Sequence, residues 1–414
     1  MVALKTKGGY FVKIVILGGA GGQGLYSTKE IIRGGVFDEI VVASRNLEKT
    51  QEIVDQLEAP NVKAAQIDVM DKEALVDLIS DADVVANCTG PYYLLGEYVV
   101  EAAIEAGVNY IDFCDDVTVH KALFSKDYHE RAKEKNISMI IGLGASPGVM
   151  PLQAYAVAKE FDEVDDIDFY MGIDAQDDAE GPAVLLHVIE NFVDDIDVIR
   201  DAKVATEKPF EGAIMYDFEG PIGEVMISTM GHPEVFTIPR VLPEAKNITV
   251  KLGFYPSKAF EYMRELIEAG LATEEALIVN GKEVVPRDFL VSHMIETLDS
   301  HEAERKLEQP VTGSVVRVTG IKDGKRIEYI NRSFGRMGPA TGYPLAIGAE
   351  MLAQGKIEKK GIMVPEECID AIPFLTEFAT RSAKAGHLSL GRTDIKTEEI
   401  SDHLDLMDKF DIEF

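Results

Sequence analysis

The chain has 414 residues, of which 46% are hydrophobic and 27% charged, and this is enough for two or three domains with large cores. Its formal net charge of −31 argues against contact with nucleic acid or an anionic membrane, because both require positive charge where they bind. No apolar run approaches the roughly 20 residues that span a bilayer, and Met1 to Tyr10 do not resemble a secretory signal. Three scattered cysteines provide no disulfide framework, so we expect a cytoplasmic protein with a small-molecule partner.

The first part of the chain, residues 1–150, alternates apolar segments with amphipathic ones. Apolar runs at consecutive positions are typical of strands that are covered on both faces, and the stretches between them have helical periodicity. This alternation predicts a doubly wound parallel sheet of the Rossmann type. The six expected strands are Ile14–Leu17, Ile40–Ala43, Val62–Asp68, Val84–Cys88, Tyr110–Phe113 and Ser138–Gly144.

Residues 151–335 have a different pattern, which predicts a second α+β domain with a mixed or antiparallel sheet for substrate binding or dimerisation. Val311–Ser333 alternates around "KDGK", which is typical of a hairpin with a two-residue turn. The helical segments expected here are Pro182–Val193, Ser257–Ala269 and Arg287–Leu298.

The last part, residues 336–414, is expected to be helical. Thr341–Gly355 has a helical pattern. Glu398–Phe414 contains seven acids and one lysine, and we expect a helix on the surface or between subunits.

A glycine-rich stretch, "GGAGGQG", follows the first expected strand and precedes a helix. Gly19, Gly21 and Gly24 fit G-x-G-x-x-G, with Gly22 and Gln23 inside the pattern. In this position the first glycine permits a tight turn, the second lets a pyrophosphate approach the backbone, and the third lets helix and strand pack closely. The stretch therefore predicts a dinucleotide site, and the alternative is a turn with no ligand.

The end of the second expected strand indicates the type of dinucleotide. An acid there would bind the ribose 2′-hydroxyl of NAD, whereas this chain has Ser44 and Arg45. Arg45 can form a bidentate contact with the 2′-phosphate of NADP, so we favour NADP. If Arg45 instead stacks on the adenine, NAD remains usable. Asp68 and Val69, after the third strand, are expected to border the adenine.

The crevice of such a sheet lies between its first and fourth strands. Cys88, Thr89, Gly90 and Pro91 follow the fourth strand, and we expect them near the nicotinamide. Tyr92 comes next, and it either reaches the substrate or packs within the loop.

Polar residues that suit a substrate follow the later strands. Asp115, after the fifth strand, is the candidate to bind a substrate ammonium group or exchange its proton, and solvation at the surface is the alternative. Arg240 and Arg336 are candidates for a substrate carboxylate. His232 is a candidate proton donor, and the spacing of the eight histidines predicts no metal site.

Several motifs in this order resemble the saccharopine dehydrogenase-like family. They are "GGAGGQG", "VVASRN", "NCTGPYYLLGEYVVEAAIEAGVNYIDFCDD", "GLGASPGVMPLQAYA", "GHPEVFTIPR" and "TGYPLAIGAEMLAQGKIEKKGIMVPEE". The resemblance implies NAD(P)-dependent chemistry on an amine, a homodimer built through the second domain, and a return of Thr341–Gly355 to the cofactor domain. Ser146 departs from the pattern, because several amino-acid-acting members have an acid before this Pro-Gly turn.

The leading hypothesis is an NAD(P)-dependent oxidoreductase acting on the C–N bond of an amino-acid or polyamine-like substrate. One alternative is an NADP-binding sensor or scaffold without turnover. A second alternative is a dehydrogenase of C–O bonds, such as those of hydroxy acids.

Overall fold

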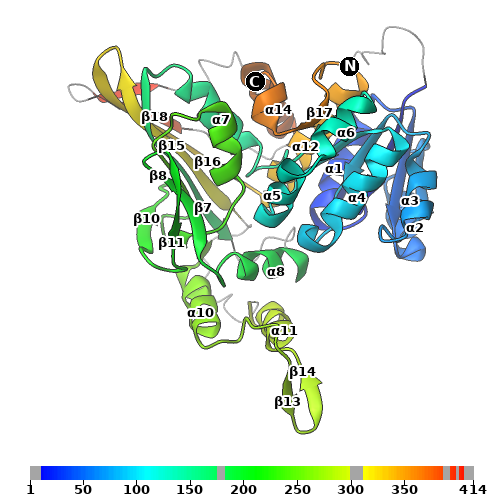
Figure 1. Ribbon diagram of the computed structural model, residues 1–414, viewed down its shortest axis with the longest axis horizontal. Coiled ribbons are helices and arrows are strands. Elements are labelled where there is room, and N and C mark those ends of the chain that lie inside the picture. Colours follow the sequence, from blue (N-terminus) through cyan, green and yellow to red (C-terminus); the bar gives the residue numbers. More distant parts are fainter. Residues whose placement is uncertain (1–10, 175–181, 299–310, 386–391, 398–400, 405–414) are drawn as a thin grey trace.

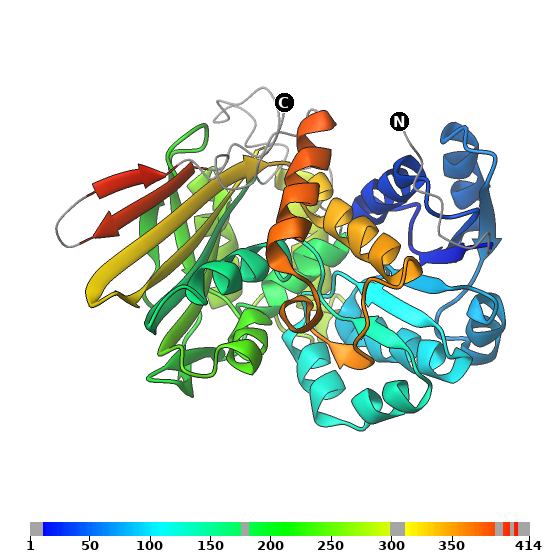
Figure 2. The same cartoon turned by 90° about the horizontal axis from the view of Figure 1, so that it is seen from above.

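The computed structural model describes residues 11–174, 182–298, 311–385, 392–397 and 401–404. These residues form two lobes, each built on its own sheet (Figure 1). Seen from above, helix α14 (Ala371–Lys384) lies between the lobes (Figure 2). None of the helices described combines the length and apolar composition that crossing a membrane requires.

The first sheet has seven parallel strands in the order β17-β6-β5-β4-β1-β2-β3. The order reverses between β1 and β4, which confirms the predicted doubly wound sheet. The strands are β1 Lys13–Leu17, β2 Glu39–Ser44, β3 Val62–Gln66, β4 Val84–Asn87, β5 Asn109–Asp112, β6 Ser138–Ile140 and β17 Gly361–Met363. The last strand, β17, has only three residues and was not expected.

Helices cover both faces of this sheet. Its strands are apolar at consecutive positions, so each face presents apolar side chains that must be buried. In β1, Ile14 and Ile16 belong to one core, whereas Val15 and Leu17 belong to the other. The first core is covered by α1, α12 and α14, and the second by α3, α4, α5 and α6. The helices not yet bounded are α1 Gly22–Gly34, α2 Leu47–Gln56, α3 Lys72–Ile79, α4 Tyr92–Ala106, α5 Val117–Ser125, α6 Tyr128–Glu134, α12 Met337–Ala353 and α13 Pro365–Cys368.

The second sheet has ten strands along the path β10-β11-β12-β7-β15-β16-β18-β19, and β8 pairs with both β12 and β9. Only β7 and β12 pair in parallel, so the sheet is mixed, as predicted. Its strands are β7 Glu163–Asp174, β8 Ile196–Arg200, β9 Lys203–Glu207, β10 Ile214–Asp217, β11 Glu224–Thr229, β12 Asn247–Tyr255, β15 Thr312–Lys322, β16 Lys325–Gly335, β18 Arg392–Thr397 and β19 Ser401–Leu404. The helices of this part are α7 Val149–Ala158, α8 Pro182–Glu190, α9 Glu234–Val241, α10 Ser257–Glu268 and α11 Pro286–Leu298.

The predicted hairpin is confirmed as β15 and β16. Asp323 and Gly324 form its turn with φ values of 51° and 72°. Positive φ at both central residues matches the twist of a two-residue hairpin, which explains the Asp-Gly pair.

Some predicted boundaries are wrong. The third and sixth strands end at Gln66 and Ile140, before the polar or glycine-rich turns that follow them. The predicted helix over Glu398–Phe414 is wrong at Ser401–Leu404, which form β19; the rest of that prediction lies outside the described residues. Strand β18 forms hydrogen bonds with the backbone N–H and C=O groups on the outer edge of β16, and β19 pairs with β18. The two strands therefore extend the second sheet instead of forming helices.

The expected return of Thr341–Gly355 is seen in α12, which packs against α1. A Cβ on Gly338 or Gly342 would lie within 3 Å of Tyr26 atoms, so both glycines permit this close packing. Immediately after this helix, β17 completes the first sheet beside β6.

Candidate functional site

The glycine turn between β1 and α1 has the geometry of an anion cradle. Gly18 has a left-handed φ of 73°, and its Cβ would lie 2.7 Å from the Cys88 carbonyl oxygen. At Gly24 a Cβ would lie 2.5 Å from the Gly18 oxygen, so this glycine serves internal packing. At Gly21 no neighbour lies closer than 3.9 Å, so the backbone is open to a ligand.

The helix that follows leaves N–H groups unpaired at this turn. Gly21 is the N-cap of α1, and no side chain caps the helix. Gly22, Gln23 and Gly24 form its first turn, whose N–H groups have no intrahelical acceptor. Together with the helix dipole, these groups favour a phosphate. Gly19 fills the packing role at the turn itself, since its Cβ would lie 2.6 Å from both Ile16 and Thr28 atoms.

The end of β2 places Ser44 and Arg45 at the surface beside this turn. The Ser44 hydroxyl shares a hydrogen bond of 2.6 Å with Thr50, and Arg45 is exposed. Among the residues that the structure describes, no acidic side chain forms an ion pair with Arg45. After β3, Asp68 is exposed and accepts a hydrogen bond from the Met70 N–H, whereas Val69 is buried in the core.

The loop after β4 is held by a buried polar network. The Asn87 side chain donates to the Tyr110 hydroxyl at 2.9 Å, which donates to Asp112 at 2.7 Å. Asn87 also accepts hydrogen bonds from the N–H and hydroxyl of Thr89. Tyr92 is buried, and its hydroxyl donates to the Asn87 carbonyl at 2.7 Å. The structure thus gives Tyr92 the packing role, which was the alternative to substrate contact.

Cys88, Gly90 and Pro91 complete this loop. Burial raises the pKa of the Cys88 thiol to about 12, so the thiol stays protonated at neutral pH. The Gly90–Pro91 peptide is cis. The loop lies at the carboxyl ends of β1 and β4, which is the crevice where a doubly wound sheet binds its ligand.

A cluster of five polar residues joins the two lobes. The Ser146 hydroxyl, in the turn after β6, donates to Glu234 at the start of α9, and the other Glu234 oxygen pairs with His232 Nδ1. His187 Nε2 on α8 lies 3.4 Å from Asp115 Oδ2 in the loop after β5. Ring nitrogens of His187 and His232 and a carboxylate oxygen of Asp115 all lie within 4.8 Å of one another.

The charges in this cluster are set by burial and by direct pairing. Burial favours a neutral His232, but the charge and hydrogen bond of Glu234, assisted by Asp115, outweigh it and raise the pKa of His232. Burial likewise favours a protonated Glu234, but His232 and then Ser146 outweigh it and lower the pKa of Glu234. Each partner thus favours the charged form of the other, with the imidazolium of His232 paired to the carboxylate of Glu234.

Sequence reasoning found this cluster only in part. Asp115 and His232 were singled out for the strand end or loop in which they lie, and Ser146 for its departure from the family pattern. His187 and Glu234 were missed, because no spacing relates them to Asp115 and only the pairing of the two lobes brings them together. The "GHPE" segment holds both His232 and Glu234, but it carries no signal that the two are buried.

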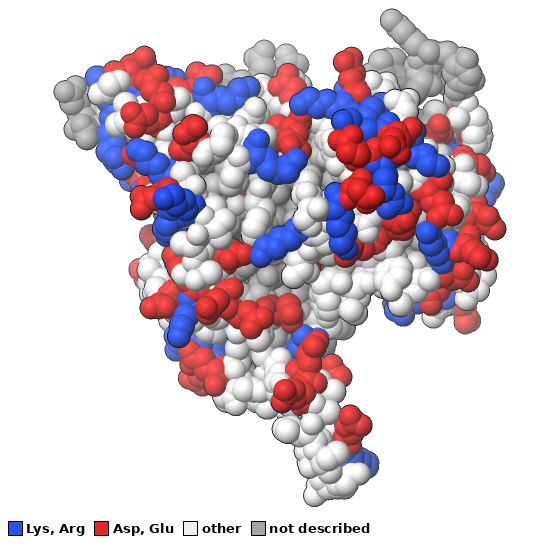
Figure 3. Space-filling view, viewed as in Figure 1, with Lys and Arg blue, Asp and Glu red and all other residues white. Residues whose placement is uncertain are grey.

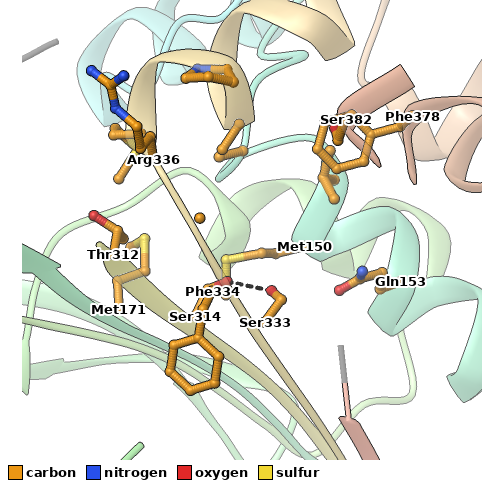
Figure 4. A pocket seen from close by; sticks show the side chains of 16 residues that line it. Met150, Gln153, Met171, Thr312, Ser314, Ser333, Phe334, Arg336, Phe378 and Ser382 are labelled. Atoms are coloured by element: carbon orange, nitrogen blue, oxygen red, sulfur yellow. Dashed lines mark hydrogen bonds between the residues drawn. The ribbon is translucent and has the colours of Figure 1, made fainter. Parts of the chain in front are cut away.

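The two candidate arginines differ in their surroundings. Arg240 is bonded through Nε and Nη2 to one Glu367 oxygen, and its guanidinium lies 4.1 Å from the Phe124 ring centre. Arg336 donates to the Tyr26 hydroxyl at 3.0 Å. Arg336 borders a cavity of about 60 Å³, where Figure 4 shows its guanidinium pointing away from the hydrogen-bonded Ser314–Ser333 pair.

That cavity lies between the lobes, beside the turn that carries Ser146. It is lined by the first turn of α12, the start of α7 and the hairpin strands, and most of the side chains are apolar. Met150, Met171, Phe334 and Phe378 are among them (Figure 4).

Comparisons with known proteins agree with this architecture. Residues 14–140 match the saccharopine dehydrogenase NADP binding domain, and residues 186–383 match the saccharopine dehydrogenase C-terminal domain. The chain is 27% identical to carboxyaminopropylagmatine dehydrogenase of Synechocystis sp., over 91% of this chain and 96% of that protein. It is 26% identical to carboxynorspermidine synthase of Vibrio alginolyticus, over 86% and 92%.

A solved structure has the same fold along nearly the whole chain. Saccharopine dehydrogenase (L-Glu forming) of Saccharomyces cerevisiae superimposes with a TM-score of 0.65 at 17% identity, covering 92% of this chain and 99% of that one. The two matched domains together account for most of this sequence. The chain belongs to the saccharopine dehydrogenase-like family.

Proposed function

We propose that the protein is an NADP(H)-preferring oxidoreductase that acts on the C–N bond of an amino-acid or polyamine-like substrate. The observation that carries this proposal is that the glycine cradle, Asp115 and Ser146 all follow the carboxyl ends of the parallel strands, where the remaining cluster residues of the second lobe meet them. Two curated relatives that match along most of their length are named for carboxylated polyamine-like compounds.

The preference for NADP rests on Ser44 and Arg45. Arg45 is exposed, and the residues at the end of β2, Ser44 and Arg45, include no acid that would bind the ribose 2′-hydroxyl. The guanidinium of Arg45 could donate two parallel N–H···O hydrogen bonds to the 2′-phosphate. When bound, the nicotinamide exchanges the hydride, and the residues of the chain bind the substrate, orient it and move protons.

Asp115 is proposed to contact the substrate amine. Its side chain is 38% exposed, so a substrate can reach it, and its carboxylate lies 3.4 Å from His187 Nε2. The high negative charge of the chain assists the approach of a cationic substrate. Arg240 would have to exchange its Glu367 partner for a substrate carboxylate, and Tyr92 acts by fixing the loop after β4.

We further propose a cytoplasmic homodimer, which is supported by an arm on the second lobe. The hairpin of β13 (Leu277–Val279) and β14 (Lys282–Val284) stands away from the body and carries few charges in Figure 3. Leu277, Ile278 and Val279 are 55%, 74% and 48% exposed. Apolar side chains on a projecting strand favour burial against a second copy. Light scattering of the wild type and of an Ile278→Lys variant tests this: a wild-type monomer contradicts it.

An activity assay with both cofactors tests the reaction class. Carboxyaminopropylagmatine and carboxynorspermidine are offered with NADP+ and with NAD+, and a panel of hydroxy acids is offered beside them. We expect turnover of an amine with NADP+, and a Gly21→Ala variant serves as the matched control that should not bind the cofactor tightly. NADP binding without turnover of any substrate would instead favour a sensor or scaffold, and oxidation of hydroxy acids alone would favour C–O chemistry.

A further inference from the structure

Glu234 and His232 form a buried charged pair that the cofactor site does not require. Glu234 has 0% exposed side-chain surface and His232 has 4%. Burying two charges is costly unless each is paired and hydrogen-bonded, and here Ser146 satisfies the second carboxylate oxygen. Because Nδ1 of His232 is held by Glu234, Nε2 is the ring atom that remains to exchange a proton.

Two further titratable side chains, those of His187 and Asp115, lie between this pair and solvent. His187 is 12% exposed and Asp115 is 38% exposed, so exposure rises steadily along the series. His187 Nε2 lies 3.4 Å from Asp115, and a nitrogen of His232 lies within 4.8 Å of both. One water molecule or one ring rotation bridges separations of this size. We infer that Glu234, His232, His187 and Asp115 form a proton relay between solvent and the reacting C–N centre of the substrate.

The relay supplies a proton that C–N chemistry needs. This step rests on the function proposed above. When an amine adds to an aldehyde, the resulting carbinolamine loses its hydroxyl group only if the oxygen is protonated. His232 donates that proton, the C–O bond breaks with its electron pair leaving as water, and the nitrogen lone pair forms the C=N bond. His187 then returns a proton to His232 and regains one from water beside Asp115. In the reverse direction His232 first passes the proton on Nε2 to His187, which releases one to water beside Asp115, and the emptied Nε2 then accepts a proton from the attacking water.

The relay is assembled from both lobes. Asp115 and Ser146 lie at strand ends of the first sheet, whereas His187, His232 and Glu234 belong to the second lobe. Proton delivery is therefore continuous only when the lobes are as close as they are here.

Two other titratable groups face this cluster. His120 on α5 is buried, its Nδ1 contacts the Asp116 carbonyl, and burial lowers its pKa, so it stays neutral. Glu366 on α13 is also buried, and burial raises its pKa to about 8. Neither supplies a competing charge at neutral pH. The cluster spacing would also admit a metal ion, which would displace the proton that the relay carries, so metal binding and proton transfer are competing uses of this cluster.

Substitution of the histidines tests the relay kinetically. With whichever of carboxyaminopropylagmatine and carboxynorspermidine the wild type oxidises, we expect His232→Gln to lower kcat by about 100-fold or more. A rapid burst of NADPH, close to one per site, should persist, because hydride transfer precedes the slowed hydration. His187→Gln should lower kcat less and be rescued by added imidazole. His129→Gln, on α6, is the matched control and should behave as the wild type.

A second measurement is independent of turnover. In ¹⁵N NMR of labelled histidines, Glu234→Gln should lower the pKa of His232, and His187→Gln should shift the titration of His232. The relay is overturned if the burst disappears together with kcat, if His232 titrates identically in the His187 variant, or if added Zn²⁺ binds stoichiometrically through these side chains. A wild type that oxidises neither substrate would refute the proposed function, and the NMR titrations would still decide whether the relay exists.

Discussion

Two glycines of the cradle should respond differently to the same substitution. In Gly24→Ala, the new methyl carbon would lie 2.5 Å from the Gly18 oxygen and 2.9 Å from the Cys88 Cβ, so α1 and the two strand ends must separate. Overpacking of this kind costs about 1–3 kcal/mol, which lowers the melting temperature of a domain of this size by about 2–12 °C. Gly21→Ala meets no atom closer than 3.9 Å, and the φ of −121° suits alanine, so the stability of the ligand-free protein should not change.

Cofactor affinity should be reduced directly in Gly21→Ala, the variant whose stability is expected to be unchanged. The methyl group added in Gly21→Ala projects where a pyrophosphate would approach the backbone. If it removes one charge-assisted hydrogen bond between an N–H group and the pyrophosphate, worth about 1.5–3 kcal/mol, binding weakens about 10- to 100-fold. Thermal unfolding of the ligand-free proteins and fluorescence titration with NADPH measure the two effects. The reasoning is refuted if Gly24→Ala melts with the wild type, or if Gly21→Ala binds NADPH as tightly as the wild type does.

Three further substitutions test other features. Arg45→Ala should weaken NADPH binding about 10- to 100-fold through loss of a charged contact and leave NADH binding unchanged; equal losses for both cofactors would indicate stacking on the adenine. Arg381→Met should destabilise the protein by about 3–5 kcal/mol in chemical denaturation, because Arg381 bonds the buried Glu30 and Glu350, whereas Lys384→Met serves as control. Glu366→Gln should be more stable than the wild type near pH 8 and equal to it near pH 4.5. The folded-state pKa of about 8 exceeds the ordinary value of 4.5, so the wild type loses up to about 1.4 kcal/mol per pH unit as pH rises through that window; parallel stability curves would contradict this.

The sequence predicts the cofactor lobe well because its signals are local. A buried strand, a glycine turn and a helix follow one another within residues 13–34, and each constrains its neighbours through backbone conformation. The Asp323–Gly324 hairpin is predictable for the same reason. Strands such as β17 and β18 are not predictable in this way, since each is short and is stabilised by an edge that belongs to a distant part of the chain.

The residues of the candidate site also fall into those that local sequence predicts and those that depend on distant parts of the chain. The roles proposed for Gly21, Ser44 and Arg45 can be inferred from the sequence, because each residue has a fixed position in a local strand–turn–helix pattern. The Glu234–His232 pair is not, because nothing in "GHPE" distinguishes a solvated loop from one that is buried against Ser146 of the other lobe. Tyr92 illustrates a third case: the sequence left substrate contact and loop packing open, and only the fold shows that its hydroxyl donates to the Asn87 carbonyl.

The path of the chain has a consequence for how the protein is made. It leaves the first sheet after β6, builds most of the second, returns through α12 to place β17, and then leaves again for β18 and β19. During synthesis, the edge of β6 and the apolar face that α12 covers stay open until more than 350 residues have been joined. A fragment that ends near residue 150 contains the whole glycine cradle but exposes that face, so it should aggregate instead of binding the dinucleotide.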